Sequence, residues 1–377
     1  MKKSYKIYSA IMFLLLFIPG ILVLIMPGRD FSANENRYLD KLPEINAQEI
    51  FSGELQEKVS DAFNDQFIVR DFMMGLSTSF KKTIGFKDIG GVYLAKDKYY
   101  IEKITDNDIK KDQFVQNLMH LSYFAEKQKA EVYTMLVPSP GTALNGKLPA
   151  FAPFYNPDSV YNTVNTILGK QGIIDLREVL GKSSNKNNNG NLYFKTDHHW
   201  TLQGAYAAYN EYCKTAGLKP QDYNSFNPVK VSGNFYGTLY SKVIDFTAEP
   251  DSIYAIQTSQ ADNAELDCDG KKRTGIYDKE YLDKKDKYAY FFGGNYGRVD
   301  IKTGSNAGLK LLVLKDSYAN SFVPFLLNDY SQITMIDARY YNNSIIDIAS
   351  SGNYDHILIL YEINNFAGEK NIYKFIK

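Results

Sequence analysis

Apolar positions along this chain follow two spacings, and their alternation predicts an α/β protein. Some stretches repeat apolar residues at helical spacing, and others are short apolar runs of the kind that form buried parallel strands. The predicted helices cover residues 108–128, 157–170 and 201–215, and the predicted strands cover 132–137, 172–176, 192–194, 309–314, 333–336 and 357–361. This alternation is typical of a mostly parallel sheet with helices on both faces, so we expect a three-layer α/β domain.

Two regions depart from that alternation. Residues 217–308 are rich in Gly and Tyr and carry only short strand-like runs, at 253–257 and 288–292, so we interpret them as an irregular insertion that forms one wall of a substrate cleft. Residues 47–84 have helical spacing, and 85–101 predict a short β unit. We expect a membrane anchor or signal peptide at residues 1–29, a helical and short β segment at 30–107 packed on the main domain, and the main domain at 108–377 with its insertion at about 217–308.

The N-terminus carries a membrane signal. Three lysines, Lys2, Lys3 and Lys6, precede an apolar run over residues 7–26 that is about long enough to span a bilayer. Lysines ahead of the run predict a cytoplasmic N-terminus, a single-pass anchor and a main domain outside the cytoplasm. A cleaved signal peptide is the alternative and would make the protein secreted, but residues 31–33 match a cleavage site poorly.

Composition narrows the function classes. The formal net charge is zero and lysines and arginines form no dense cluster, so we expect no nucleic-acid surface. The 30 tyrosines and 23 phenylalanines suit sugar faces and ordinary β-rich cores equally well. Cys213 and Cys268 are the only cysteines, which is too few for a disulfide framework; they either pair or lie buried.

The most informative segment is residues 195–201, Lys-Thr-Asp-His-His-Trp-Thr, which holds two of the four histidines and the only tryptophan. Asp197 and His199 point the same way from an extended backbone, so the carboxylate can orient the imidazole as a general base. A hydrogen-bonded loop brace is the structural alternative. We expect no metal, because Asp197, His198 and His199 cannot all face one ion from a strand and no Glu-x-x-His or Cys partner lies nearby. A polar Ser/Asn/Lys loop at 182–190 precedes this segment.

A serine follows one of the predicted strands. Ser317 lies at a strand-to-helix turn, where its hydroxyl is exposed and backbone N–H groups can stabilise an oxyanion. We therefore combine Ser317 as nucleophile, His199 as base and Asp197 as orienting carboxylate, although a helix N-cap alone explains a serine here. Asn364 or Asn365 follows a later strand and is a candidate oxyanion donor.

Further candidates surround this triad. Arg339 follows the strand at 333–336 and either binds an acidic group of the substrate or braces its own loop. Tyr318, His198 and Trp200 flank the triad residues and are candidate substrate contacts, with a structural hydrogen-bonding role as the default for His198. We expect no cofactor.

Residues 197–200, Asp-His-His-Trp, resemble the signature of the bacterial DHHW protein family. More distantly, the chain resembles the SGNH-hydrolase-like proteins of alginate and other exopolysaccharide O-acetylation, of the AlgJ and AlgX type. The further matching pieces lie at residues 35–37, 65–70, 137–138, 316–318 and 361–365. The resemblance implies a flavodoxin-like α/β fold, a triad of Asp197, His199 and Ser317, and transfer or hydrolysis of an O-acetyl ester on an extracellular polysaccharide.

One residue departs from the hydrolase pattern. Lys315 stands where the signature Gly-Asp-Ser has glycine, which puts the turn geometry and the oxyanion hole in question. Two functions follow. The first is a membrane-anchored serine enzyme that acts on a cell-surface or secreted polysaccharide, with a polytopic membrane acyltransferase as acetyl donor by analogy. The second, favoured by Lys315, is a non-catalytic surface protein that binds glycan.

Overall fold

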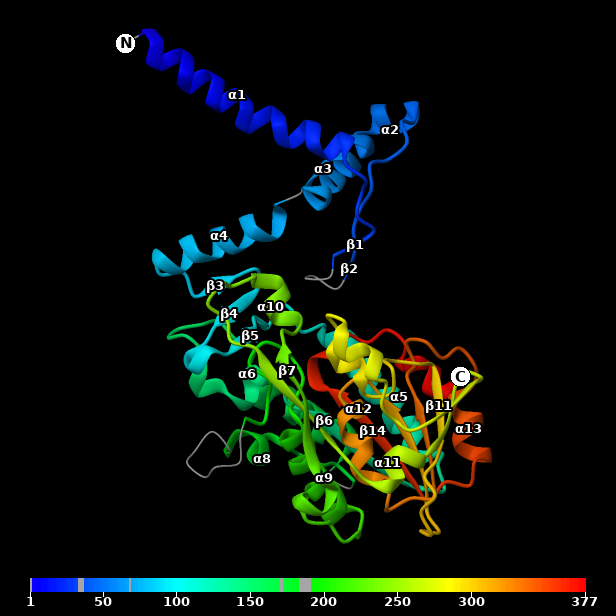
Figure 1. Ribbon diagram of the computed structural model, residues 1–377. Coiled ribbons are helices and arrows are strands. Elements are labelled where there is room, and N and C mark those ends of the chain that lie inside the picture. Colours follow the sequence, from blue (N-terminus) through cyan, green and yellow to red (C-terminus); the bar gives the residue numbers. More distant parts are fainter. Residues whose placement is uncertain (1, 33–36, 68, 170–171, 183–190) are drawn as a thin grey trace. The chain divides into compact units, whose positions relative to one another are not determined.

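The computed structural model of the chain describes residues 2–32, 37–67, 69–169, 172–182 and 191–377 (Figure 1). The chain divides into two compact units, the first formed by Met1–Gly90 with Tyr240–Thr247 and the second by Gly91–Leu239 with Ala248–Lys377. The polar loop predicted at 182–190 lies, from residue 183 onward, outside the described residues. So do residues 35 and 36 of the N-terminal matching piece.

The first unit is mainly helical. Its elements are α1 (Lys2–Ile25), β1 (Phe31–Ser32), β2 (Arg37–Tyr38), α2 (Ala47–Ser52), α3 (Glu54–Gln66), α4 (Arg70–Thr83) and β3 (Asp88–Ile89). The helical pattern predicted over 47–84 is interrupted at Gly53, whose φ of 83° is left-handed, and again at Phe67, which is extended. Residues 240–247 return to this unit, where the Thr78 hydroxyl donates to the Val243 carbonyl at 2.6 Å.

The apolar run predicted as a membrane anchor forms helix α1. Among the residues that the structure describes, no helix combines the length and the apolar character needed to cross a membrane.

The second unit is built on a central sheet. In its described residues seven strands follow the order β10-β9-β11-β13-β12-β14-β6. Their bounds are Lys271–Thr274 (β10), Glu265–Cys268 (β9), Arg298–Lys302 (β11), Gln332–Ile336 (β13), Lys310–Lys315 (β12), His356–Glu362 (β14) and Glu131–Val137 (β6). The last four pair in parallel, and β9, β10 and β11 add antiparallel pairs. The predicted α/β class with a mostly parallel sheet is therefore confirmed, and the sheet is mixed.

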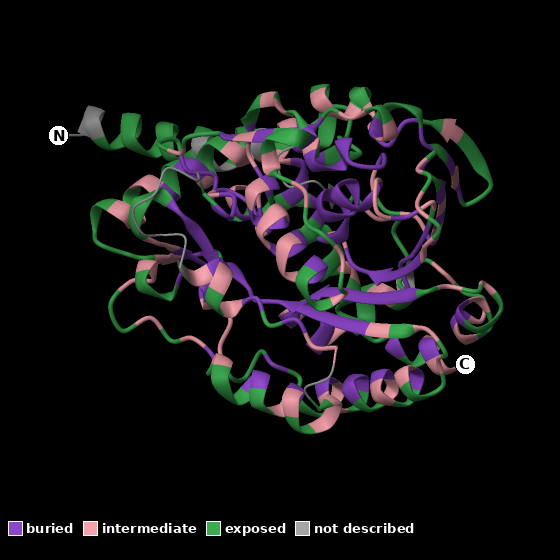
Figure 2. Ribbon diagram, turned by 90° about the horizontal axis from the view of Figure 1, so that it is seen from below, coloured by how far each residue is buried: buried purple, intermediate pink, exposed green. Residues whose placement is uncertain are grey.

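Helices cover both faces of this sheet, which explains why the parallel strands are apolar at successive positions. In β12, Leu311 and Val313 face one core cluster, whereas Leu312 and Leu314 face another. The first cluster is covered by α8 (Arg177–Lys182), α9 (Leu202–Thr215), α11 (Ser259–Asn263) and α12 (Ala319–Phe322), and the second by α5 (Lys111–Glu126), α7 (Pro157–Leu168), α13 (Ile345–Ser351) and α14 (Ile363–Gly368). Figure 2 shows the buried strands between these helical layers.

The insertion is more regular than its sequence indicates. Strands β9, β10 and β11 extend the central sheet, and β7 (Pro228–Phe235) pairs antiparallel with β8 (Asp251–Ile256) as a separate hairpin. The run predicted as a strand at 288–292 is instead a 3₁₀ turn, Lys287–Tyr290. Its backbone turns back on itself, since the Ala289 N–H donates to the Asp286 carbonyl at 3.3 Å and the Phe291 N–H donates to the Tyr288 carbonyl at 3.2 Å.

Two other predictions of short strands were wrong. Residues 172–176 contribute one isolated bridge, between Ile173 and Thr134, and residues 192–194 contribute one, between Tyr193 and Trp200. The first runs parallel to β6 only briefly: the Thr134 N–H donates to the Gly172 carbonyl at 2.8 Å and the Ile174 N–H donates to the Thr134 carbonyl at 2.9 Å, and the pairing ends after that one bridge. The β unit predicted over 85–101 includes β4 (Val92–Leu94), which pairs with β5 (Tyr100–Glu102).

Candidate active site

The carboxyl ends of neighbouring parallel strands bring most of the predicted site residues together. Strand β12 leads into Ser317, and β14 leads through Glu362 into Asn364 and Asn365 on helix α14. The segment 195–201 ends at Thr201, which caps helix α9 by accepting from the Gly204 backbone N–H at 3.3 Å. This cap and the helix that follows agree with the sequence pattern.

Asp197, His199 and Ser317 form an unbroken hydrogen-bonded chain. The Ser317 Oγ lies 2.7 Å from His199 Nε2, and His199 Nδ1 lies 2.6 Å from Asp197 Oδ1. Asp197 and His199 are 2% and 6% exposed, whereas Ser317 is half-buried. The geometry is that of a hydroxyl hydrogen-bonded to a base that a carboxylate orients.

The surroundings favour a neutral imidazole beside a charged carboxylate. The pKa of His199 is lowered to about 4, because burial and the charge of His198 together outweigh the opposing effect of Asp197. Burial alone would raise the pKa of Asp197, but the charges of both histidines and hydrogen bonds from His199 and Thr238 more than offset it, so this pKa is lowered. At neutral pH, His199 Nε2 can therefore accept a proton from Ser317.

The insertion holds the Asp197 carboxylate from the other side. Thr238 donates to Asp197 Oδ2 from its backbone N–H at 2.8 Å and from its hydroxyl at 3.1 Å. A Cβ added to Gly237 would lie 2.2 Å from the Asp197 Cβ and 2.3 Å from its Oδ2, so only glycine fits there. Sequence reasoning missed both residues, because nothing local in the Gly-Thr pair indicates that it meets a carboxylate 41 residues earlier.

A second carboxylate fixes the start of the same loop. Asp251, on β8, accepts from the backbone N–H groups of Lys195 and Thr196 at 3.0 Å and 2.7 Å, and from the Thr196 hydroxyl at 2.7 Å. The Thr196 oxygen in turn accepts from the Gly237 backbone N–H at 3.1 Å. The loop that carries Asp197 and His199 is thus held by the β7–β8 region, which was not apparent from sequence.

The aromatic neighbours of His199 have mostly structural contacts. Trp200 is fully buried, and its Nε1 donates to the Tyr318 carbonyl at 3.1 Å and to the Ser321 hydroxyl at 2.9 Å, so it does not face a ligand. The Tyr318 hydroxyl donates to the His198 carbonyl. Tyr288, which sequence analysis did not single out, stacks on the His199 ring with centroids 3.9 Å apart.

The turn after β12 is fixed by the Asp316 carboxylate. Its oxygens accept from the Tyr318 backbone N–H, from the Glu362 backbone N–H and from Asn365 Nδ2, each at 2.9 Å. Asn364 Nδ2 donates to Glu362 at 2.8 Å. Both predicted oxyanion donors therefore lie at this end of the sheet with one N–H bound to a carboxyl oxygen, and the choice between them stays a prediction.

Lys315 points away from this turn into a buried polar network. Its Nζ lies 2.9 Å from the Asn295 side-chain oxygen, 2.8 Å from that of Asn320 and 4.0 Å from Asp337 Oδ2. Burial lowers the pKa of Lys315 to about 8. Arg339 donates to both Asp337 oxygens, at 2.9 Å and 2.6 Å, so its observed contact is a brace of its own loop. The Lys315 side chain leaves the triad hydrogen bonds intact.

A cleft of about 330 Å³ lies beside the triad. Its lining residues come from β5 and the residues that follow it, the turn after β6, the triad loop, helix α10 (Thr238–Val243) and the ends of β12 and β14: Glu102, Lys103, Ile104, Asp108, Ile109, Ser139, Pro140, Gly141, His198, Leu239, Tyr318, Glu362, Asn364 and Asn365. Burial raises the pKa of Glu362 to about 8, although backbone N–H groups of Asn364 and Asn365 donate to it. The cleft is lined by His198 and Tyr318, the chain neighbours of His199 and Ser317, rather than by the triad residues themselves.

The donor atoms of Asp197, His198 and His199 lie within 4.8 Å of one another. The expectation that these adjacent residues cannot face one ion was therefore wrong, because the segment bends rather than running as a strand. These atoms are nevertheless engaged: both His199 nitrogens bond within the triad, and His198 Nδ1 lies 2.7 Å from the Thr238 hydroxyl. A metal would have to displace these hydrogen bonds.

The DHHW protein family matches residues 69–336, which is more than half of the sequence, so the chain belongs to this family. A solved DHHW family protein from Eubacterium siraeum is similar at 23% identity and a TM-score of 0.65, over 77% of this chain and 96% of that one. PatB1 from Bacillus cereus, solved with a sulfonyl adduct, is similar at 22% identity and a TM-score of 0.60, over 75% of this chain and 99% of that one.

The O-acetyltransferase domain of AlgJ from Pseudomonas putida is similar at 13% identity and a TM-score of 0.46, over 74% of this chain and 93% of that one. The predicted resemblance to the DHHW family is confirmed. No curated protein matches the sequence.

Proposed function

We propose that the protein is a serine-dependent enzyme that transfers or hydrolyses O-acetyl groups of a cell-surface or secreted polysaccharide. The observation that carries the proposal is the continuous chain of short hydrogen bonds from Asp197 through His199 to Ser317. Polysaccharide O-acetylation is the chemistry that the motif resemblance implies, and membership of the DHHW family supports it.

The geometry supports a two-step acyl transfer. Ser317 Oγ attacks the acetyl carbonyl while His199 Nε2 takes the hydroxyl proton, and the Asp197 carboxylate stabilises the imidazolium that forms. The tetrahedral intermediate collapses, the donor's alcohol oxygen leaves with the proton from His199, and acetyl-Ser317 remains. A sugar hydroxyl or a water molecule then attacks the acetyl group, losing its proton to His199; when this second tetrahedral intermediate collapses, the C–O bond to Ser317 breaks and His199 returns the proton to the Ser317 oxygen.

We place this reaction outside the cytoplasm. The support is the apolar run over residues 7–26 with lysines ahead of it. Acetyl groups made in the cytoplasm would then have to cross the membrane, so a polytopic acyltransferase is the proposed donor partner. Protease treatment of intact cells that express the protein tests the location, because an external main domain is degraded without lysis.

The test of the chemistry uses the full chain, a fluorophosphonate probe and an activated acetyl ester, with intact mass as the readout. We expect one adduct on the wild type, none on Ser317→Ala, and at least about 10³-fold slower labelling of His199→Ala. Ser351→Ala is the matched control, because it removes an exposed serine on α13. A folded wild type that forms neither an adduct nor free acetate would instead support the non-catalytic glycan-binding protein.

Transfer and hydrolysis are separated in a second step. Acetyl-Ser317 formed from the activated ester is mixed with an oligosaccharide, and the sugar products are analysed by mass. An added acetyl group on the sugar identifies a transferase, and acetate alone identifies an esterase.

A further inference from the structure

A second cavity, of about 440 Å³, lies apart from the catalytic cleft and shares none of its lining residues. Its walls come from residues 191–203, from the 223–228 segment and from the start of β8. The loop that carries Asp197 and His199 borders both cavities, since Lys195 and Thr201 line this one and His198 lines the cleft. We call it the Tyr254 cavity.

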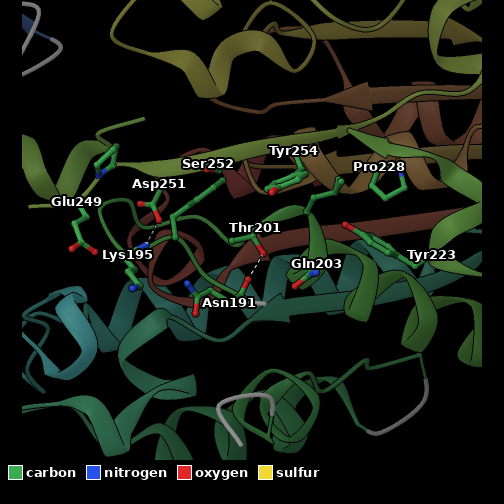
Figure 3. Close-up of a pocket in the computed structure, with 13 residues that line it drawn as sticks. Asn191, Lys195, Thr201, Gln203, Tyr223, Pro228, Glu249, Asp251, Ser252 and Tyr254 are labelled. Atoms are coloured by element: carbon green, nitrogen blue, oxygen red, sulfur yellow. Dashed lines mark hydrogen bonds between the residues drawn. The ribbon is translucent and has the colours of Figure 1, made fainter. Parts of the chain in front are cut away.

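The lining combines aromatic faces with planar polar groups. Figure 3 shows Glu249, Asp251 and Lys195 at one end, Tyr223 and Pro228 at the other, and polar side chains between them. Aromatic rings stack on the apolar face of a sugar ring, and amide and carboxyl groups bond its hydroxyls. The volume is within the range of small-ligand pockets and accommodates one or two sugar rings.

Gln203 supplies a polar atom that still lacks a partner. Its Oε1 is buried and accepts no hydrogen bond from the described residues. A ligand hydroxyl that reaches this oxygen would supply the missing hydrogen bond. Tyr254 is 43% exposed, so its ring is available from solvent.

The charges favour an uncharged ligand. The cavity is lined by two carboxyl groups, Glu249 and Asp251, and by one lysine, Lys195, and a second lysine, Lys98, forms an ion pair with Glu249. Asp251 is fixed by its hydrogen bonds to Lys195 and Thr196, so this wall is rigid before any ligand arrives. A uronate ring would bring a third negative charge to the same end, and an uncharged ring would not.

We propose that the Tyr254 cavity is a non-catalytic subsite for one or two uncharged sugar rings of the polysaccharide acceptor. This inference rests on the proposed function, because a polymeric acceptor extends over several rings. Binding energy gained away from the reacting ester holds the chain while one of its hydroxyls reaches Ser317.

The test is isothermal titration calorimetry of the full chain carrying Ser317→Ala. The probes are cellohexaose, chitohexaose and an oligomannuronate hexasaccharide. We expect saturable binding of one of the two uncharged hexasaccharides, and at least about tenfold weaker binding of the oligomannuronate. Tyr254→Ala and Gln203→Met should each weaken binding of the uncharged sugar about tenfold. Gln203→Met should not lower the melting temperature, because the oxygen that it removes has no partner.

Tyr373→Ala is the matched control, since Tyr373 is 42% exposed and lies outside both cavities. It should bind sugar as well as the parent does. A loss of binding in this control equal to that in the Tyr254→Ala variant, or no saturable binding at all, would overturn the subsite. Labelling of Ser317 tests the proposed function separately, and Tyr373→Ala should leave that labelling unchanged.

Discussion

At the scale of single residues, the site depends on an imidazole that is neutral although a carboxylate contacts it. Burial of His199 outweighs the attraction of Asp197 and lowers the imidazole pKa to about 4. An ordinary histidine has a pKa near 6.5. The neutral form accepts the Ser317 proton, so the base is available well below neutral pH.

The first prediction follows from that pKa. The rate constant for fluorophosphonate labelling of Ser317 should stay constant from pH 8 down to about pH 5, because His199 is neutral there. It should fall as the pH drops through about 4, where His199 becomes protonated. The pH profile of labelling, measured by intact mass, checks this.

His198→Gln provides the control for this profile. The charge of His198 lowers the pKa of His199, and an amide at the same position can still bond Thr238. The inflection in the labelling profile of His198→Gln should therefore lie at higher pH than that of the wild type. A wild-type inflection at 6.5 or above would show that the surroundings of His199 do not favour the neutral form.

The second prediction concerns the close approach of Gly237 to Asp197. In Gly237→Ala the methyl group must displace the Asp197 carboxylate, since the added Cβ would lie 2.2 Å from the Asp197 Cβ. A displacement of about 1 Å in a catalytic group can cost about 100-fold in rate, so labelling of Ser317 should slow by at least about that factor. Gly308→Ala is the control, because nothing lies within 4 Å of the Cβ built there. Unchanged labelling in a folded Gly237→Ala protein would remove Gly237 from the site.

Sequence analysis identified the three triad residues but not the residues whose hydrogen bonds hold them in place. Asp-x-His and a serine after a strand are chemically distinctive, so Asp197, His199 and Ser317 could be paired across 118 residues. Thr238 and Asp251 act through ordinary hydrogen bonds and have no distinctive sequence neighbours. Trp200 was considered for substrate contact, although its ring is fully buried.

At the scale of elements, Lys315 at the end of β12 departs from the Gly-Asp-Ser signature and still fits the fold. Lys315 ends the strand on the side opposite to Leu314, and its ammonium joins Asn295 to Asn320 on helix α12. The lysine therefore connects the turn after Ser317 to the glycine-rich segment 293–297. Its presence does not require a different turn.

The third prediction is that restoring the signature glycine harms the protein. Lys315→Gly removes the donor from the buried Asn320 oxygen and one donor from the exposed Asn295 oxygen, which should lower the free energy of unfolding by about 2–3 kcal/mol. The melting temperature should fall by about 5–10 °C, and labelling of Ser317 should not speed up. Lys310→Gly, at the start of the same strand, is the control for the cost of glycine in β12. Faster labelling without loss of stability would show that Lys315 hinders the reaction.

Element prediction was most accurate for helices and strands whose apolar pattern is visible within the element itself. Helices α7 and α9 and strands β12, β13 and β14 lie within a few residues of their predicted bounds. The strands of the insertion were missed as parts of the central sheet because β11 pairs with β13 and β9, and such pairing depends on partners distant in sequence. Periodicity within 265–302 carries no information on those partners.

At the scale of the whole molecule, the site draws on segments that are far apart in the sequence but belong to one unit. The triad loop, the β7–β8 region and the turn after β12 all lie within Gly91–Leu239 and Ala248–Lys377. Cys213 on α9 and Cys268 on β9 belong to the same hydrophobic core cluster, and the structure has both as buried free thiols. The alternative that they pair is wrong, since the cysteines are unbonded.

The last prediction uses these thiols to ask whether the core of this unit unfolds as one. Burial raises the pKa of Cys213 to about 12 and raises that of Cys268, so iodoacetamide at pH 8 should alkylate neither thiol in the native protein. In urea, both should become reactive at one midpoint, together with the loss of Ser317 labelling, because one core buries both cysteines. Alkylation of Cys268 at lower urea than Cys213 would instead show that the sheet extension β9–β11 opens on its own. The triad would then be expected to survive that opening, since none of its residues lies on these strands.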